Sequence, residues 1–278
     1  MHSQMSVITL TTDFGNRGYM VASIKGAILK EYENAYLVDI THEVEPFNIA
    51  EAAFLIRNVY KDFPDGTVHI IGVDSLPNKV TKLLAAKIDG QYFISADNGI
   101  LSLILAEQRP ENMVEITLGR FHEFSNFPTR DIFVPVACHL LRGGKLEVIG
   151  NYTETYKELN TIRPVIHGDD NIMGNVIHID NYGNVITNIQ KKLFEEKRRA
   201  RNFVIQVRHL PFEKIVDRYA DAVKDFENEV DYHGEKMVLF NSAGYLEVAV
   251  YKGNPNSFGG ASSLLGLSVG DVISVEFS

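Results

Sequence analysis

The sequence predicts a mixed α/β protein: an N-terminal α/β sheet domain followed by a smaller, β-rich domain. The chain of 278 residues is 45% hydrophobic and 23% charged, which is ordinary for a globular protein of one large or two smaller domains. In the first half, short apolar runs alternate with helical patterns. Past about residue 150 the helical patterns give way to short strand-like segments. These two hydrophobic patterns predict two domains of different architecture.

The first half begins with an apolar run at residues 7–10 that leads into Thr-Thr-Asp-Phe-Gly, which indicates a buried strand followed by a turn. Apolar residues at helical spacing predict helices over residues 19–30, 49–59, 99–107 and 133–141. Further strands are expected over residues 35–40, 68–73, 83–87 and 92–95. Asp89-Gly90 predicts a hairpin between the last two strands. The alternation favours a sheet with right-handed crossovers.

The second half opens with a polar stretch, residues 151–170, that has no strong period and is interpreted as a linker. We therefore expect domains at residues 1–155 and 168–278. Gly, Asn and Asp separate the strand candidates that follow it. These candidates are residues 175–179, 184–187, 203–207, 237–240, 245–251 and 272–277.

Composition and charge exclude several classes of protein. A net charge of −9 argues against nucleic-acid binding, and the basic stretch at residues 191–201 also contains glutamates. No apolar run approaches the roughly 20 residues that span a membrane, and the first residues lack the regions of a signal peptide. A cytoplasmic protein is expected. The lone Cys138 excludes an intrachain disulfide, and the histidines show no metal-ligand spacing, so neither a metal nor a cofactor is expected.

Two acidic residues follow predicted strands of the first domain. Asp13 and Asp74 stand at carboxyl ends of strands, where open α/β sheets bind ligands. A carboxylate at Asp13 could accept two hydrogen bonds from a ribose diol, whereas Asp74 could act as a base or orient a water. Either residue could instead simply form a turn or cap a helix.

The second domain offers two polar turns. Residues 180–184, Asp-Asn-Tyr-Gly-Asn, form a good tight turn by their composition alone. In a functional interpretation, Asp180 binds an ammonium group and Asn184 binds the edge of an adenine, because an amide both donates and accepts hydrogen bonds. Residues 241–244, Asn-Ser-Ala-Gly, form a second such turn, for which a plain loop is the simpler interpretation when it stands alone.

In their order and their residues, these segments resemble sequences of the S-adenosyl-L-methionine hydrolase (adenosine-forming) family, which is related to bacterial fluorinase and chlorinase. The matching segments run from one end of the chain to the other. They are LTTDFG at 10–15, VDITHEVEPFNIAEAAFLI at 38–56, ADNGIL at 96–101, TRDIFVPVACHL at 129–140, HIDNYGNVITNI at 178–189, NSAGYLEVAV at 241–250 and GLSVGD at 266–271.

The resemblance implies a C-terminal β-barrel-like domain and a homotrimer whose sites lie between one subunit's first domain and its neighbour's second. It also implies binding roles for particular residues. Asp13 resembles the acid that holds the ribose hydroxyls, and Phe47 the aromatic that packs over the ligand. Asp180 and Ser242 resemble contacts to the methionine amino and carboxylate groups. Tyr182 resembles the residue that packs against the adenine ring, and Asn184 resembles the polar residue that hydrogen-bonds to the adenine edge.

The catalytic positions depart from the family pattern. The family's hydrolases typically read Asp-Pro-Gly-Val-Gly followed by an Arg, and later Phe-His-Gly-Arg-Asp. Aligned without gaps, the Arg position is Thr81 and the His position is Pro128, while Gly18 replaces a further acid. Of the residues that surround the attacking water, only Asp74 remains.

We therefore expect hydrolysis of S-adenosyl-L-methionine to adenosine and L-methionine by water attack at C5′, impaired by the residues at 81 and 128. One alternative is a catalytically weak or inactive protein that binds this ligand. A halide-dependent adenosyl transferase is a further alternative, because Thr129 falls near a hydroxyl-bearing position of the halogenases. The carboxylate of Asp74 would repel an anion there. A sugar- or nucleotide-binding protein without sulfonium chemistry is the third.

Overall fold

A computed structural model of the chain describes residues 6–76, 81–106, 108–117, 125–160 and 162–278. The chain divides into two compact units, Met1–Thr161 (unit 1) and Ile162–Ser278 (unit 2), which are considered separately below. Unit 1 is a mixed α/β domain and unit 2 is built mainly from strands, so the predicted fold class is confirmed.

Unit 1 contains a seven-stranded sheet in the order β2-β1-β3-β5-β4-β6-β7. Its strands are β1 (Val7–Thr12), β2 (Tyr36–Thr41), β3 (Val68–Gly72), β4 (Leu83–Ile88), β5 (Gln91–Ala96), β6 (Asn112–Ile116) and β7 (Gly150–Tyr152). The first four neighbours in this order pair in parallel, and β4, β6 and β7 extend the sheet antiparallel. The predicted hairpin of β4 and β5 is present, and β1 is buried along its whole length.

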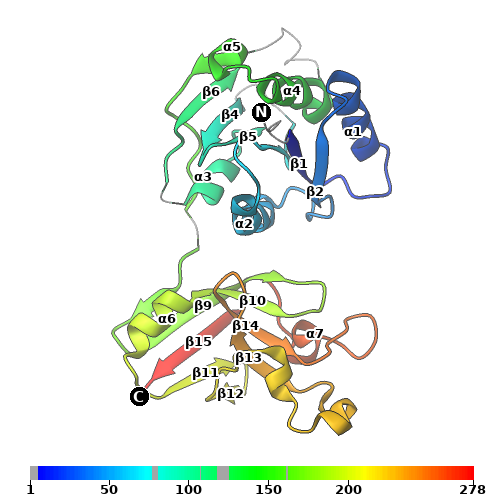
Figure 1. Ribbon diagram of the computed structural model, residues 1–278. Coiled ribbons are helices and arrows are strands. Elements are labelled where there is room, and N and C mark those ends of the chain that lie inside the picture. Colours follow the sequence, from blue (N-terminus) through cyan, green and yellow to red (C-terminus); the bar gives the residue numbers. More distant parts are fainter. Residues whose placement is uncertain (1–5, 77–80, 107, 118–124, 161) are drawn as a thin grey trace. The chain divides into compact units, whose positions relative to one another are not determined.

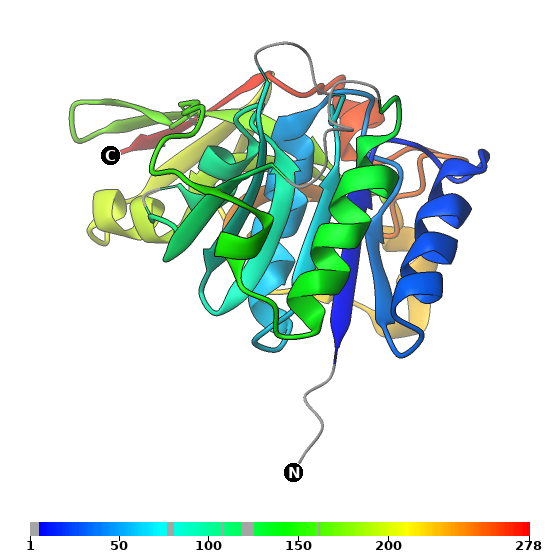
Figure 2. The same ribbon diagram turned by 90° about the horizontal axis from the view of Figure 1, so that it is seen from above.

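Helices cover both faces of this sheet (Figure 1; Figure 2). One apolar core joins α1 (Met20–Glu31) and α4 (Val134–Leu141) to one face, and a second joins α2 (Ile49–Val59) and α3 (Ile100–Leu105) to the other. A short helix, α5 (Leu146–Ile149), precedes β7. Helix α2 starts where the Asn48 side chain accepts a hydrogen bond from the Glu51 N–H at 3.1 Å, which satisfies one of the free donors of the first turn. The parallel strands β1, β2, β3 and β5 therefore have their carboxyl ends at one edge of the sheet.

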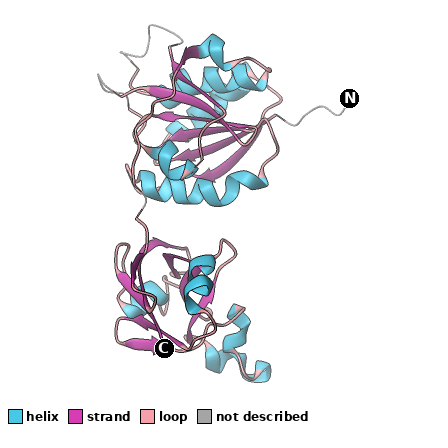
Figure 3. Cartoon of the chain, turned by 90° about the vertical axis from the view of Figure 1, so that its left-hand side faces the viewer, coloured by secondary structure: helices cyan, strands magenta, loops and turns pink. Residues whose placement is uncertain are grey.

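Unit 2 is a nearly barrel-shaped antiparallel sheet in the order β12-β11-β15-β9-β10-β14-β13, with β8 added beside β9 (Figure 3). Its strands are β8 (Val165–His167), β9 (Asn171–Ile179), β10 (Val185–Gln190), β11 (Phe203–Val207), β12 (Leu210–Phe212), β13 (Lys236–Phe240), β14 (Tyr245–Val250) and β15 (Val272–Phe277). Phe194 of α6 (Lys191–Arg198) fills the core, where its ring makes edge contacts with Phe203, Phe240 and Phe277. A last helix, α7 (Ala261–Leu265), precedes β15.

The interpretation of residues 151–170 as a linker was wrong at both ends. Strand β7 continues to Tyr152 and pairs with β6, and Val165–His167 forms β8 against β9. Both are short edge strands whose exposed side chains carry no apolar alternation, so the pattern that reveals buried strands is missing. Residues 213–235, which had no assignment, contain two 3₁₀ segments, Tyr219–Ala222 and Phe226–Tyr232.

Candidate functional site

The first group of site residues lies at the carboxyl ends of β1 and β3. These strands are paired in parallel with Thr12 opposite Gly72, so the loops that carry Asp13 and Asp74 leave the sheet side by side. The backbone N–H of Asp74 donates to Asp13 Oδ2 at 3.3 Å. The structure therefore brings together the two acids that the sequence singled out, in the arrangement expected for ligand sites of open α/β sheets.

Phe47 joins the same point from the loop before α2. Its backbone N–H donates to Asp13 Oδ2 at 3.0 Å, and its ring is 69% exposed. Phe47 and Asp74 both have left-handed backbone angles, with φ values of 67° and 44°. Such conformations are uncommon for residues with side chains and concentrate at functional sites. Two strained residues held by one carboxylate indicate a shaped binding surface with an exposed aromatic ring.

Asn98, which the sequence reasoning did not single out, fixes the Asp74 turn. Its Nδ2 donates to the carbonyl oxygens of Val73 and Asp74, both at 3.1 Å. Its Oδ1 accepts from the Ile100 N–H, which begins α3. The Asn-Gly pair of ADNGIL indicates the local turn to the Ile100 N–H, but the contacts with Val73 and Asp74 span 25 and 24 positions and have no short-range signal.

Thr129 lies under the Asp74 turn rather than at the surface. It starts a π-helical turn, Thr129–Phe133, and its side chain is fully buried. Its hydroxyl lies 3.0 Å from that of Ser75, a second residue that the sequence reasoning missed. A Cβ on Gly72 would lie 2.9 Å from the Thr129 side chain, so this close approach requires glycine.

The positions that depart from the family pattern supply no cation. Thr81 is half-buried before β4, and Pro128 is buried before the π-helical turn. Lys82, which follows Thr81 in the sequence, pairs with Glu115 at 2.7 Å. Lys79 lies outside the described residues. Arg130 pairs with the neighbouring Asp131 at 2.6 Å.

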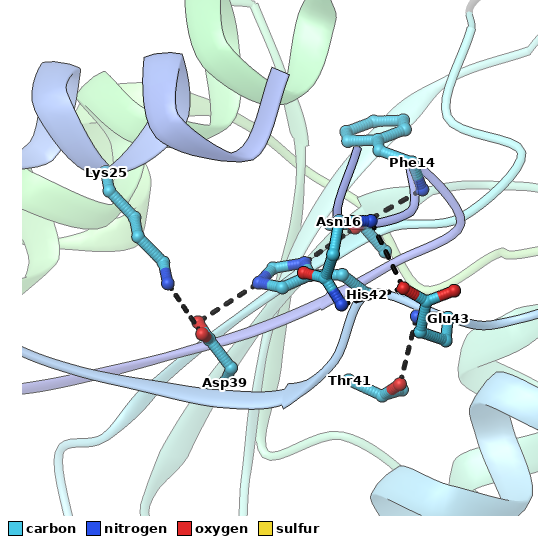
Figure 4. Close-up of polar contacts among 8 residues, drawn as sticks. Phe14, Asn16, Lys25, Asp39, Thr41, His42 and Glu43 are labelled. Carbon is cyan, nitrogen blue, oxygen red and sulfur yellow. Dashed lines mark hydrogen bonds and ion pairs between the residues drawn. The ribbon is translucent and has the colours of Figure 1, made fainter. Parts of the chain in front are cut away.

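The loop after Asp13 is tied to the loop after β2 (Figure 4). The buried His42 lies with Nδ1 2.8 Å from the Thr12 hydroxyl, and its carbonyl oxygen accepts from the Gly15 N–H at 2.8 Å. Its Nε2 lies 3.1 Å from Asp39 Oδ1, an ion-pair distance with poor hydrogen-bond alignment. Burial raises the pKa of Asp39, but Lys25 and His42 outweigh it and hold the pKa below its usual range. His42 thus anchors the Asp13 turn, a role that no sequence pattern indicated.

The second group of residues lies in unit 2, in the turn between β9 and β10. Asp180 Oδ1 accepts the backbone N–H groups of Tyr182 and Asn184 at 2.9 and 2.8 Å, and Oδ2 accepts Asn184 Nδ2 at 3.0 Å. The ring of Tyr182 is 64% exposed. Asn184 is 5% exposed, and its Oδ1 accepts no hydrogen bond from any residue that the structure describes. A buried carbonyl oxygen of this kind needs a donor.

The turn between β13 and β14 presents Ser242 to solvent. Asn241 shapes this turn, because its Oδ1 accepts the N–H groups of Ala243 and Tyr245 at 3.1 and 3.0 Å. Unit 2 therefore brings together Asp180, Tyr182 and Asn184 in one turn, and Ser242 stands in another. The predicted residues fall into two groups, one on each unit.

The described residues contain no cluster of three or more His, Cys, Asp or Glu side chains that would hold a metal. No described helix is both long and apolar enough to cross a membrane.

Fold and site together define a two-domain protein in which an α/β unit and a barrel-like β unit each present a carboxylate turn and an exposed aromatic ring. Comparison with known families identifies the protein family within this class. Residues 8–150 match the N-terminal domain and residues 174–274 the C-terminal domain of the SAM hydroxide adenosyltransferases. The chain belongs to this family.

Similar proteins span nearly the whole chain. It is 31% identical to an (R)-S-adenosyl-L-methionine hydrolase of Methanocaldococcus jannaschii, over 98% of this chain and 97% of the relative. It is 25% identical to a fluorinase of Actinopolyspora mzabensis, over 87% and 90%. A crystal structure of an uncharacterized conserved protein from Thermotoga maritima superimposes with a TM-score of 0.82 and 32% identity, covering 97% of this chain and 99% of the other.

Proposed function

We propose that this protein hydrolyses S-adenosyl-L-methionine to adenosine and L-methionine. The observation that carries the proposal is the single carboxylate of Asp13, which holds both Asp74 and Phe47 at the carboxyl edge of the sheet. Relatives named as hydrolases of this compound, similar over almost the full chain, support the same activity.

Each residue has a defined part in the proposed reaction. Asp13 accepts the ribose hydroxyls, and the ring of Phe47 packs on the ligand. In unit 2, the unpaired Oδ1 of Asn184 accepts the adenine amino group, beside the ring of Tyr182. Asp180 and Ser242 contact the amino and carboxylate groups of the methionine end.

The chemical step is a displacement at C5′. The oxygen of water forms a bond to C5′ while the C5′–S bond breaks, and its electron pair returns to sulfur. Methionine leaves as a neutral thioether, so no acid is required for its departure. Asp74 takes the proton from the attacking water and releases it to solvent. Most of the rate must come from aligning the water behind C5′.

The decisive experiment incubates the protein with each sulfonium epimer of S-adenosyl-L-methionine and follows adenosine by chromatography. Wild type, Asp74→Asn and the double variant Thr81→Arg/Pro128→His are compared. The proposal expects release by wild type, strong loss in Asp74→Asn and faster release by the double variant. Equal rates for wild type and Asp74→Asn would remove Asp74 as the base.

A binding protein without catalysis is the second candidate, favoured by Thr81 and Pro128 at the positions where the family resemblance places Arg and His. Wild type that binds the ligand in calorimetry but releases no adenosine would establish it. Repeating the incubation with fluoride or chloride tests halide transfer. Two features argue against an anion beside Thr129. Its side chain is fully buried and its hydroxyl is hydrogen-bonded to that of Ser75. The Asp74 carboxylate would also repel a halide ion.

We also propose a cytoplasmic homotrimer in which one ligand contacts residues of two subunits. The separation of the predicted residues between two units of the chain supports this assembly. Mixing Asp13→Ala with Asp180→Ala subunits should restore part of the activity, because some composite sites would then carry neither substitution. A stable monomer in light scattering at micromolar concentration would contradict it.

A further inference from the structure

Unit 2 contains a buried acid next to the proposed ligand turns. Glu247 lies on β14, which pairs with β10 on one side and β13 on the other, and is only 2% exposed. Its Oε1 accepts a hydrogen bond from the Tyr219 hydroxyl at 2.6 Å, and its Oε2 accepts one from Asn241 Nδ2 at 3.1 Å. Asn241 is the residue that shapes the turn carrying Ser242.

The charge of Glu247 has no protein counter-ion in the described part of the chain. Its hydrogen-bond partners, Tyr219 and Asn241, are neutral, and the nearby charged group that acts on it is another acid, Asp180. Burial and the nearby Asp180 hold the pKa of Glu247 above its usual range, although both donated hydrogen bonds favour the carboxylate form. A buried carboxylate without a cation is costly unless something else compensates it.

A second observation points to a ligand in this part of unit 2. Asn184, which donates to Asp180, is at least nine-tenths buried and has an acceptor oxygen that no described residue satisfies. The same part of unit 2 therefore has an unmatched acceptor and two carboxylates. A ligand that supplies both a hydrogen-bond donor and a positive charge matches these features.

Tyr219 is held in place by the segment between β12 and β13. Val216 bridges to Leu239, and the buried Val223 packs in a small apolar cluster with Met237 and Tyr251. This segment thus covers the outer side of β13 and β14 and brings the Tyr219 hydroxyl to Glu247.

We propose that Glu247, held by Tyr219 and Asn241, is a specificity-determining positioning residue that makes this part of unit 2 select the cationic sulfonium substrate over neutral thioethers. The proposal rests on the proposed function and deepens it. S-Adenosyl-L-methionine carries one net positive charge, whereas S-adenosyl-L-homocysteine, with the same ammonium and carboxylate groups, is neutral. Both products of hydrolysis are also neutral overall. Glu247 therefore favours the substrate and not its products.

The test measures by calorimetry the affinities of wild type and Glu247→Gln for S-adenosyl-L-methionine, S-adenosyl-L-homocysteine and adenosine. Glutamine keeps the size and an acceptor for Asn241 but removes the charge. We expect affinity for the sulfonium compound to fall about tenfold, affinity for S-adenosyl-L-homocysteine to fall less because it shares only the ammonium group, and affinity for adenosine to change less than about twofold. KM should rise while kcat is not lowered, because the charge on sulfur disappears during reaction.

Glu229→Gln is a matched control, because Glu229 also accepts from a tyrosine, Tyr251, at 2.6 Å, but pairs with Lys252. It should leave the preference for the sulfonium compound unchanged. If Glu247→Gln does not fold, Tyr219→Phe serves instead, with an expected loss of about threefold for the sulfonium compound and smaller losses for the two neutral ligands.

Equal losses for all three ligands would show a general structural role and overturn the proposal, as would an unchanged preference. Wild type that binds the ligands but releases no adenosine would overturn hydrolysis while leaving charge selection to be judged by the same affinities. Wild type that binds none of the three ligands would overturn the proposed function itself.

Discussion

The two aspartate turns of this protein use one side-chain chemistry over very different distances along the chain. Asp13 in unit 1 accepts backbone N–H groups from residues 34 and 61 positions away, whereas Asp180 in unit 2 accepts them from residues two and four positions away. The first carboxylate assembles a site from three separate loops, and the second shapes its own turn. The comparison teaches that a carboxylate can be a local turn former in one place and the junction of a site in another.

The largest difference between unit 1 and unit 2 is expected in the kinetics of variants at Asp74 and Asp180. Asp74→Asn is expected to lower kcat by about 10²–10³, the loss typical of one preorganised polar group at a reacting centre. Asp180→Asn should mainly raise KM, because it acts on binding. Steady-state kinetics of both variants provide the measurement. If Asp180→Asn lowers kcat as much as Asp74→Asn does, the assignment of chemistry to unit 1 fails.

Acid should weaken unit 1 before unit 2. His69 of β3 is buried, 2.7 Å from the Thr9 hydroxyl and 2.6 Å from the Gln91 amide oxygen, and burial lowers its pKa from 6.5 to about 4. Above pH 6.5 the histidine is neutral in both the folded and unfolded states. As the pH falls from 6.5 towards 4, only the unfolded state binds the proton, so roughly 3 kcal/mol of stability should be lost.

Hydrogen exchange across this pH range should show that loss in the strands of unit 1. His69→Gln cannot titrate and gives the baseline. Parallel curves for wild type and the variant would mean that another group causes the acid sensitivity.

The stability of the aspartate turns tests the comparison directly. Asp13→Ala removes the acceptor of two N–H groups from distant loops, and both folding stability and adenosyl affinity should fall by about 1–3 kcal/mol. Asp180→Ala disturbs one turn and should cost about 1 kcal/mol of folding stability. Urea unfolding and calorimetry measure both quantities. A larger loss of folding stability in Asp180→Ala than in Asp13→Ala would contradict this comparison of the two turns.

The smallest effect is expected at Phe47. Its left-handed backbone suits glycine, so Phe47→Gly should keep folding stability within about 1 kcal/mol of wild type while adenosyl affinity falls. Phe47→Ala is the matched control, because it removes the ring and keeps the strain. Unchanged affinity in both variants would exclude the ring from ligand binding.

Sequence reasoning succeeded where a signal was local. The buried strand before Asp13 and helix α2 have strong apolar patterns, and the Asp89-Gly90 hairpin has turn chemistry. Strands β7 and β8 were missed because their exposed edges lack such patterns.

Parts of the candidate site could not be predicted because their contacts join distant residues. His42, Asn98 and Ser75 act through hydrogen bonds to residues that only the folded sheet brings close, as in the Ser75–Thr129 pair, which spans 54 positions. Likewise, the contact of Tyr219 with Glu247 depends on how a segment without regular strands packs on β13 and β14. No short-range pattern encodes such contacts.

The reach of the Asp13 carboxylate also has a kinetic consequence. Its two N–H donors come from loops that meet only after β1, β2 and β3 have paired, and contacts of this separation form late because loop closure must come first. A ligand that needs this junction cannot bind a partly folded chain. Adenosyl ligands should therefore slow unfolding while leaving the refolding rate unchanged, so the protein would be protected by its substrate only once it is complete.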